Sequence, residues 1–149
     1  MKVKTLFSLL TLTTLFYSCR QEKSINELME AKTTVCYQSV SEKDTAWLKI
    51  DTSKRDIIGF LTFKYANNKN YDGQFKGKMY GDTLKGHFDF TVNKVDKWYR
   101  NPVAFLKRDG KLTMGVGDFN MVWGSPIFDP KTTIDYNKGR FVFEKGDCK

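Results

Sequence analysis

The chain has 149 residues, which is enough for one domain and hardly for two. Apolar residues make up 40% of it and aromatic residues 15%, which is ample for a core and excludes disorder of the whole chain. The formal net charge of +8 favours anionic partners, but the basic residues are scattered along the chain rather than clustered. This scatter argues against nucleic acid as a partner, because a nucleic-acid interface requires a basic patch.

The first eighteen residues predict a secretion signal. Lys2 and Lys4 give a positively charged start, and residues 5–17 form an apolar stretch of thirteen residues without a charged side chain. Such a stretch is too short to cross a bilayer comfortably as a helix, and its position after a basic start is typical of a cleaved signal peptide. Loss of residues 1–18 would leave 23 basic and 17 acidic side chains, a net charge of +6.

Residues 16–19, Phe-Tyr-Ser-Cys, resemble the bacterial lipobox. The resemblance implies that cleavage falls just before Cys19 and that the Cys19 thiol becomes a thioether to diacylglycerol. Ser18 fits the motif, whereas Phe16 and Tyr17 depart from its usual residues, so a plain signal peptide cut near Ser18 is the alternative. No Asp follows Cys19, which by the same resemblance points to the outer membrane and leaves the periplasmic or surface-facing side open. Several acyl chains on one terminus anchor a protein stably, so the membrane is the first expected partner.

Residues 19–33 predict a polar tether with a short helix. Residues 24–27, Ser-Ile-Asn-Glu, have the spacing of a capping box, and Ile25, Leu28 and Met29 fall on one face of a helix. A helix of about two turns is marginal without tertiary contacts. The folded domain is therefore expected to span residues 34–149.

From residue 34 onward, short extended runs alternate with turn signals. We expect strands at residues 34–40, 45–50, 57–65, 71–80, 83–92, 97–107, 111–123 and 139–144. The alternation is clearest in the fifth run, where Leu84, Phe88 and Phe90 share the face opposite that of Lys85 and His87. Side chains of one face can therefore be buried while those of the other remain in solvent.

The connections between these runs predict the topology. Gly81-Asp82 and Asp109-Gly110 are typical of two-residue hairpin turns, and residues 124–138, with two of the three prolines, predict one long loop. Eight strands with mostly short connections predict an all-β fold, a single antiparallel meander. Such a sheet hides its edges by closing into a barrel, here similar in outline to lipocalin-like barrels, and a two-sheet β-sandwich is the alternative.

With Cys19 lipidated, Cys36 and Cys148 remain as an even pair. An exported protein meets an oxidising compartment, where an even pair of cysteines is typical of a disulfide. The first and last strands of a closed meander are neighbours, so this disulfide would link the two ends of the sheet. Two free thiols are the alternative, and the cysteine spacing does not suit a metal site.

The best candidate binding cluster consists of Trp98, Tyr99 and Arg100, because aromatic rings beside a cation can stack on or cover a ligand. Trp123 is expected to join them from the long loop. The alternative is ordinary packing of these aromatic side chains within strands. His87, the single histidine, has no visible catalytic partner. No catalytic pair, cofactor-binding loop or metal cluster emerges, so we expect a protein that is not an enzyme and holds no cofactor.

Four short stretches resemble a family of small Bacteroidota lipoproteins. The stretches are residues 36–37 (Cys-Tyr), 43–45 (Lys-Asp-Thr), 81–84 (Gly-Asp-Thr-Leu) and 103–107 (Val-Ala-Phe-Leu-Lys). Together with the signal, the resemblance covers most of the chain. It implies a lipid-anchored, β-rich envelope protein, and it implies no functional residues because no activity is established for that family.

We therefore expect a membrane-anchored envelope lipoprotein whose barrel binds a small or anionic ligand or a neighbouring envelope component without catalysis. The outline of the expected fold is also similar to that of the membrane-bound lysozyme inhibitors. The alternative is therefore a protein inhibitor of a hydrolase such as lysozyme, which would act through residues 124–138. A wide internal pocket would favour the first hypothesis, and a filled barrel with one exposed loop would favour the second. Because lysozymes are usually basic, a net charge of +6 would slow that encounter.

Overall fold

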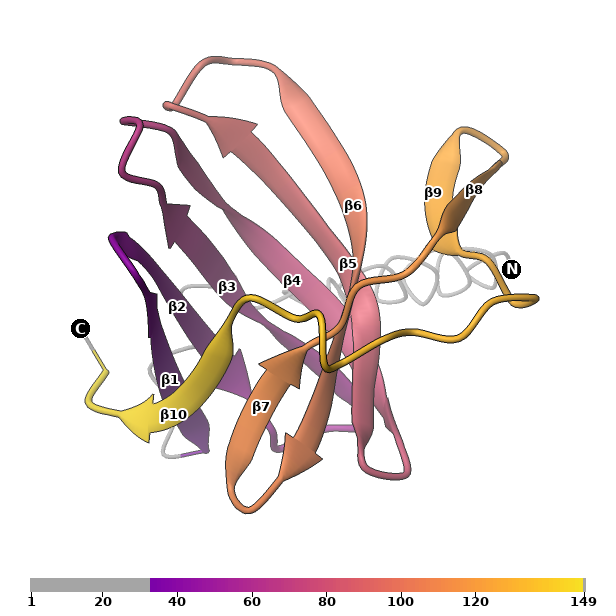
Figure 1. Ribbon diagram of the computed structural model, residues 1–149, viewed down its shortest axis with the longest axis horizontal. Coiled ribbons are helices and arrows are strands. Elements are labelled where there is room, and N and C mark those ends of the chain that lie inside the picture. The colour runs from indigo at the N-terminus through magenta and orange to yellow at the C-terminus, as the bar shows by residue number, and fades with distance from the viewer. Residues whose placement is uncertain (1–32, 149) are drawn as a thin grey trace, which may run out of the picture.

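The structure, a computed structural model, describes residues 33–148, which form ten β-strands (Figure 1). The strands are β1 (Thr34–Ser41), β2 (Asp44–Asp51), β3 (Asp56–Lys64), β4 (Asn70–Tyr80), β5 (Thr83–Val92), β6 (Trp98–Arg108), β7 (Lys111–Met114), β8 (Phe119–Val122), β9 (Ser125–Phe128) and β10 (Val142–Gly146). The expected signal peptide, the lipidation site Cys19 and the helix expected from residue 24 lie outside the described residues.

Eight of the strands close into a barrel in the order β1-β10-β7-β6-β5-β4-β3-β2, and every neighbouring pair is antiparallel. β1 to β7 follow one another as a meander, and β10 completes the circle between β7 and β1. The closed all-β meander expected from the sequence is confirmed, and the sandwich alternative is wrong. β8 and β9 form a separate two-stranded sheet outside the barrel.

Both predicted two-residue turns form where they are expected. Gly81 has a φ of 63°, and Asp109 and Gly110 have φ values of 51° and 76°. Positive φ at the central residues gives a turn whose twist matches that of the flanking strands. β4 with β5, and β6 with β7, are therefore paired right up to their turns.

The segment after β7 departs from the sequence prediction. The strand expected at residues 111–123 is two strands, because β7 belongs to the barrel and β8 to the separate hairpin. The loop expected at residues 124–138 contains β9, so it is not one long loop. The chain leaves the barrel wall where Gly115 packs tightly against a distant part of the chain, and a Cβ there would lie 2.3 Å from the Ile134 side chain.

Inward-pointing side chains fill the barrel. In β5, the buried Phe88 and Phe90 alternate with more exposed neighbours. The largest fully buried side chains are Phe75, Phe105, Phe143, Leu48, Leu61 and Leu84. The Phe105 ring meets the rings of Phe75 and Phe143 edge to face, with centroids 5.9 and 5.5 Å apart. These aromatic rings make the interior a packed core.

Glycines allow β4 and β5 to approach each other closely. A Cβ on Gly73 would lie 1.9 Å from the carbonyl oxygen of Asp89, and a Cβ on Gly86 would lie 2.0 Å from that of Lys76. A larger residue at either position would collide with the neighbouring backbone. The glycines therefore fix how the outer-face side chains of the two strands face one another.

The barrel has two distinguishable ends. The disulfide end carries the turns at residues 81–82 and 109–110 and the place where residue 33 leads into β1. There Cys36 and Cys148, separated by 112 residues and with their Cα atoms 5.2 Å apart, form the predicted disulfide, which is confirmed. At the opposite end, the open end, lie the turns after β3 and β5. The excursion that carries β8 and β9 runs over the outer face of the barrel, where β9 lies beside His87 and Arg100, and Tyr136 reaches Thr83 near the disulfide end (Figure 1).

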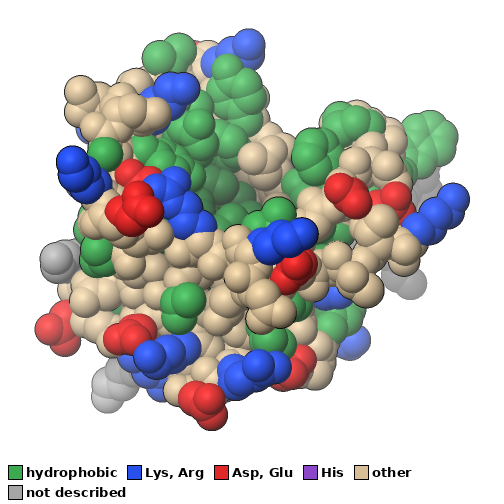
Figure 2. Space-filling view, viewed as in Figure 1, with side chains coloured by type: hydrophobic (Ala, Val, Ile, Leu, Met, Phe, Trp, Pro, Cys, Tyr) green, Lys and Arg blue, Asp and Glu red, His purple; other side chains and the backbone are tan. Residues whose placement is uncertain are grey.

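Unequal strand lengths leave a hollow at the open end. β4 and β6 have eleven residues each, whereas β7 has four and β10 has five. β6 pairs with β7 only from Phe105 to Arg108, so its first half extends beyond the shorter strands. Figure 2 shows a hollow in this region, lined by hydrophobic side chains.

Candidate functional site

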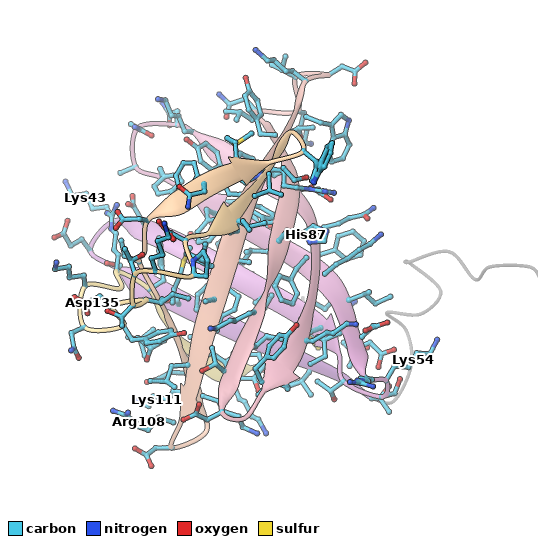
Figure 3. All side chains as sticks on the ribbon, turned by 90° about the vertical axis from the view of Figure 1, so that its right-hand side faces the viewer. Lys43, Lys54, His87, Arg108, Lys111 and Asp135 are labelled. Carbon is cyan, nitrogen blue, oxygen red and sulfur yellow. A yellow bond between two sulfur atoms is a disulfide. The ribbon has the colours of Figure 1, made fainter. Side chains whose placement is uncertain are left out.

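The β8–β9 hairpin projects from the barrel next to β6 (Figure 1). In Figure 3, the hairpin lies beside the strand face that carries His87. Pro126 of β9 is buried, and the Ser125 hydroxyl accepts a hydrogen bond from Arg100 of β6 at 3.3 Å. β9 therefore holds the hairpin against the barrel, while all four residues of β8 are exposed.

Apolar side chains cover the exposed part of the hairpin, and residues 119–128 include no charged residue. The exposed apolar side chains are Phe119 (57%), Met121 (63%), Val122 (41%), Trp123 (101%) and Ile127 (43%). Single exposed apolar residues are ordinary, but a contiguous group of them marks a surface that another molecule covers. The hairpin is therefore the strongest candidate for an interaction surface.

Trp123 has a left-handed backbone conformation, which is unfavourable for a large side chain. Trp123 and Gly124, with φ values of 50° and 77°, are the central residues of the turn between β8 and β9. This left-handed conformation usually holds glycine, asparagine or aspartate, because larger side chains clash with the backbone there. The Trp123 side chain is fully exposed, so packing within the described residues does not offset this cost.

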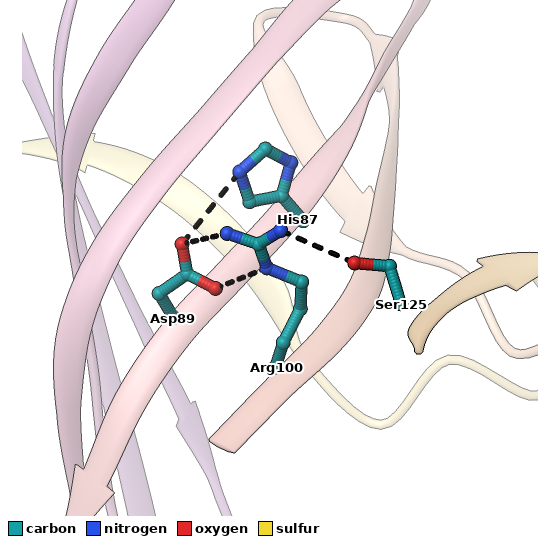
Figure 4. Close-up of polar contacts among 4 residues, drawn as sticks. All are labelled: His87, Asp89, Arg100 and Ser125. Carbon is teal, nitrogen blue, oxygen red and sulfur yellow. Dashed lines mark hydrogen bonds and ion pairs between the residues drawn. The ribbon is translucent and has the colours of Figure 1, made fainter. Parts of the chain in front are cut away.

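An ion pair between Asp89 and Arg100 lies on the outer face of the barrel beside the hairpin (Figure 4). Asp89 of β5 and Arg100 of β6 are opposite each other, and the guanidinium donates two hydrogen bonds to the carboxylate at 2.5 and 2.7 Å. The third guanidinium nitrogen donates to Ser125 Oγ at 3.3 Å. The hydrogen bonds from Arg100 hold the pKa of Asp89 below its ordinary value, and the same contact raises the pKa of Arg100. Arg100 is thus fixed between the sheet and the hairpin.

His87 lies next to this ion pair without joining it. Its Nε2 is 3.7 Å from the Asp89 carboxylate, which is too long for a hydrogen bond. Burial lowers the pKa of His87, the cations Arg100 and Lys76 lower it as well, and the opposing effect of Asp89 does not reverse the shift. The imidazole is therefore neutral at neutral pH despite the nearby carboxylate, which Arg100 already engages.

A groove runs between the hairpin and the outer face of the barrel. Its larger part has a volume of about 500 Å³ and is lined by Gln74, Asp89, Trp98, Tyr99, Arg100 and Gly124. Its smaller part, about 160 Å³, lies between His87, Pro102 and β9. Arg100 lines both parts, which together we name the hairpin groove. Trp98 is 61% exposed, so the groove offers a ring for stacking beside a fixed guanidinium.

The residues of the sequence-predicted binding cluster do not all face the same way. Trp98 and Arg100 share the outer face of β6 and line the hairpin groove. Trp123 lies in the turn at the tip of the hairpin and is not part of the groove lining, whereas its neighbour Gly124 is. Tyr99 reaches only the edge of the groove, because its ring stacks on the inward-facing Phe90 with centroids 5.6 Å apart.

Sequence reasoning missed the two residues that position Arg100, which are Asp89 and Ser125. It also missed the hairpin itself. Trp123-Gly124 has the same form as Asp109-Gly110, a residue followed by glycine between two extended runs, and this signal could have revealed the turn. Nothing local to Ser125 indicates its contact, because the contact depends on how the hairpin folds back on β6.

The arrangement offers binding contacts rather than an activated nucleophile. The four residues of Figure 4 include no hydrogen bond between His87 and Ser125. Within residues 33–148, no group of three or more His, Cys, Asp or Glu side chains is placed to hold a metal ion. None of the residues in that range forms a helix with the length and apolar character needed to span a membrane.

The hollow at the open end is a second candidate site. The Tyr71 ring contacts the rings of Tyr65 and Phe90, each with a centroid distance of 5.1 Å. Arg140 lies over the Tyr65 ring at 6.0 Å and forms an ion pair with the buried Asp44. Burial raises the pKa of Tyr65, so this phenol stays neutral. These residues belong to the segments around the open end, and an aromatic cluster beside one cation suits an apolar ligand.

The chain was compared with models of protein families, with curated proteins and with solved structures, and it matches none of them. The hairpin groove and the open end are therefore the basis on which a function can be proposed. Of the two, the hairpin groove has the more specific construction, because it combines an exposed apolar hairpin with a positioned Arg100.

Proposed function

We propose that this chain is a non-catalytic, lipid-anchored protein of the bacterial cell envelope that binds a protein partner through the β8–β9 hairpin and the hairpin groove. The observation that carries the proposal is the exposure of five apolar side chains on a projecting hairpin whose tip, Trp123, is fully exposed. The cores of protein interfaces are enriched in Trp, Met and Arg, and Met121, Trp98 and Arg100 lie on or beside this surface.

A protein partner suits this surface better than a small ligand does. A small ligand needs a concave site that buries most of its surface, whereas the hairpin projects from the barrel (Figure 1). A larger partner can cover the exposed apolar side chains and place a polar group against Arg100 in the same contact. Arg100 is already held by Asp89 and Ser125, so little of its freedom would be lost on binding.

The anchor is supported by the sequence of residues 1–19, with its basic start, its apolar stretch and Cys19. The outer membrane is the proposed location, on the same resemblance to lipobox proteins. The chain enters β1 at the disulfide end, and the hairpin packs on the outer wall of the barrel through β9. A lipid on Cys19 would tether the barrel through residues 20–33, which lead into β1.

Site-specific photo-crosslinking in cells tests this proposal. A photoreactive phenylalanine analogue replaces Trp123 in the full chain, and the same analogue replaces Tyr80 as the control. Tyr80 is also exposed, at 60%, but it lies at the disulfide end. We expect a discrete protein adduct from position 123, weakened by Arg100→Ala, and no such adduct from position 80. Identical adducts from both positions, or adducts with lipid alone at position 123, would contradict the proposal.

The identity of the crosslinked protein separates the two kinds of partner that the sequence suggests. A structural envelope protein supports an assembly role. A hydrolase supports an inhibitor, and then the purified chain should inhibit that hydrolase while Trp123→Ala should not. A basic lysozyme is a poor candidate for electrostatic reasons, because the mature chain would carry a net charge of +6.

A second candidate function, binding of a small apolar ligand, is favoured by the hollow of Figure 2 and the aromatic rings of Tyr65, Tyr71 and Phe90. Native mass spectrometry of the purified protein tests it. A retained hydrophobic molecule should be lost in Tyr71→Ala and kept in Phe119→Ala, because Phe119 lies on the hairpin. Equal retention by the two variants, or no retained molecule in the unmodified protein, would remove this candidate.

A further inference from the structure

A cluster of basic side chains lies on the outer face of β4 and β5, next to the hairpin groove. The strand register places Lys76 opposite His87 and Lys78 opposite Lys85. The Cβ atoms of directly opposed residues lie about 4.5–5.5 Å apart, and those of diagonal neighbours about 7–8 Å apart. Lysine side chains are long and flexible, so the ammonium groups of Lys76 and Lys85 can meet at one point in front of His87.

Two of these cations have no acidic partner. The ammonium of Lys78 lies 3.1 Å from the carboxylate of Asp56. Lys76 and Lys85, by contrast, form no ion pair or side-chain hydrogen bond with any described residue. Lys78, which faces Lys85 directly, is already paired with Asp56, so the uncompensated repulsion is the one between the diagonal neighbours Lys76 and Lys85. The free protein therefore carries a repulsion that a bound anion would relieve.

The cluster surrounds a surface pocket of about 450 Å³. Lys76, Lys78, Lys85 and His87 all line this pocket, and Ile58 adds apolar surface. Apolar surface beside the cations reduces the access of water to a bound anion, which strengthens its attraction to the lysines. One acid, Asp56, also lines the pocket, where its carboxylate pairs with Lys78. Asp89 lies outside the lining and is engaged by Arg100.

His87 adds a group whose protonation responds to a bound anion. The charged groups that face it are Lys76 from β4, Asp89 from its own strand and Arg100 from β6. Burial and the two cations lower the pKa of His87 in the free protein. A bound anion favours the imidazolium, so binding must raise this pKa, and protonation must in turn strengthen binding.

We propose that Lys76, Lys85 and His87 form a binding site for a tetrahedral oxyanion of the phosphate class. A phosphate monoester carries a charge of about −1.5 to −2 near neutral pH and has three acceptor oxygens, which match two ammonium groups and one ring nitrogen. Free phosphate presents this chemistry in full, and the phosphodiester headgroup of a lipid presents a singly charged form of it with two non-bridging oxygens. The site does not depend on the protein partner proposed for the hairpin.

An NMR titration of the single histidine tests the site. The His87 imidazole of the purified full chain, held in a zwitterionic detergent, is titrated in inorganic phosphate and in chloride at matched ionic strength. We expect a higher pKa of His87 in phosphate. In Lys76→Gln and in Lys85→Gln, the apparent affinity for phosphate should fall roughly fivefold, which corresponds to about 1 kcal/mol.

Lys43→Gln is the matched control, because Lys43 lies in the turn between β1 and β2 and Figure 3 shows it away from His87. It should leave the phosphate affinity unchanged. A parallel titration with short-chain phosphatidylglycerol distinguishes the source of the phosphate group. A response to the lipid alone assigns a headgroup, and a response to inorganic phosphate assigns a free anion. No response to either, or an equal loss in Lys43→Gln, would overturn the proposal.

Thermal unfolding gives an independent measurement, because loss of Lys85 should weaken phosphate binding but raise the melting temperature of the phosphate-free protein. At low ionic strength without phosphate, Lys85→Gln removes the repulsion between Lys85 and its diagonal neighbour Lys76, so the variant should melt at a slightly higher temperature than the unmodified protein. Added phosphate should raise the melting temperature of the unmodified protein more than that of the variant. Equal responses of the two proteins to phosphate would show that Lys85 takes no part in binding.

Discussion

The barrel and the β8–β9 hairpin place their large apolar side chains in opposite ways. Phe75, Phe105 and Phe143 are fully buried in the barrel, whereas Phe119 and Trp123 of the hairpin are 57% and 101% exposed. Burial of apolar surface drives folding, so stability explains the first arrangement. It does not explain the second. Folding thus accounts for the apolar residues of the barrel, and the proposed binding of a partner would account for those of the hairpin.

The turns at Asp109-Gly110 and Trp123-Gly124 have almost the same backbone conformation but hold different residues, which makes this contrast clearer. The φ values are 51° and 76° at Asp109-Gly110, and 50° and 77° at Trp123-Gly124. Aspartate tolerates the left-handed conformation because its short polar side chain can hydrogen-bond locally, and tryptophan has no such advantage. The backbone conformation therefore accounts for Asp109 but not for Trp123. The proposed contact of its exposed side chain with a partner would account for Trp123.

The largest expected effect is at the junction between the first and last strands of the barrel. Cys148→Ser removes the bond to Cys36, which bridges a sequence separation of 112 residues. A loop of this length contributes about 4–5 kcal/mol in the chain-entropy model, less any strain. We expect the free energy of unfolding in urea to fall by about this amount, while crosslinking from position 123 persists under native conditions. An unchanged free energy of unfolding would show that the β1–β10 pairing alone holds this junction.

The same substitution made once in each region tests the contrast directly. Phe105→Ala should lower the free energy of unfolding by about 3–5 kcal/mol, because it removes a fully buried ring from the core. Phe119→Ala should change it by no more than about 0.5 kcal/mol, because its side chain is exposed. Urea unfolding of both variants measures the difference. If Phe119→Ala cost as much as Phe105→Ala, the hairpin would be a structural element and the proposed role in binding would lose its basis.

The barrel could be predicted because its signals are local. Alternation along β5 and the glycines at Gly81 and Gly110 depend only on neighbouring residues. The exit from the barrel after β7 could not be predicted in this way. Residues 111–123 alternate whether the chain remains in the wall or leaves it, and the exit coincides with a close approach of Gly115 to Ile134, which is distant in sequence.

The candidate site could be predicted only in part, for a related reason. Trp98 and Arg100 could be found because an aromatic residue near a cation is visible in the sequence. Their neighbour Asp89 could not, because its position opposite Arg100 depends on the register across the loop between β5 and β6. Tyr99 lines the same groove, but its ring turns away from the side chains of its neighbours, since adjacent strand residues point to opposite faces. Its ring indeed packs on Phe90.

A smaller effect is expected at the hairpin tip, where a substitution should increase rather than decrease the free energy of unfolding. Trp123→Asn puts a residue that favours the left-handed conformation before Gly124, so the free energy of unfolding should rise by about 0.5–1 kcal/mol. The same variant should lose the protein partner, which a pull-down with the purified partner measures. Asp109→Asn is the control, and it should change neither quantity appreciably. A loss of stability in Trp123→Asn would show that Trp123 packs against the fold and would contradict its proposed role.

The smallest expected effect is a change in the pH dependence of stability. The pKa of His87 is lowered in the folded protein by burial, Arg100 and Lys76, with Asp89 opposing, so the folded state binds fewer protons than the unfolded state. The stability contributed by the neutral imidazole is therefore present above the ordinary His pKa of 6.5 and is lost as the pH falls from there through the folded-state pKa.

His87→Gln cannot titrate in this range, so it isolates that contribution. We expect the free energy of unfolding of the unmodified protein to fall more than that of His87→Gln when the pH is lowered from about 7.5 to about 5.5 in chloride, around the His pKa. Urea unfolding of both proteins at the two pH values gives the difference. Added phosphate should reduce this difference, because an anion held by Lys76 and Lys85 stabilises the imidazolium. An equal fall in both proteins would mean that His87 is as free to protonate as in the unfolded chain. The outer face of β4 and β5 would then lack the electrostatic coupling on which the proposed oxyanion site depends.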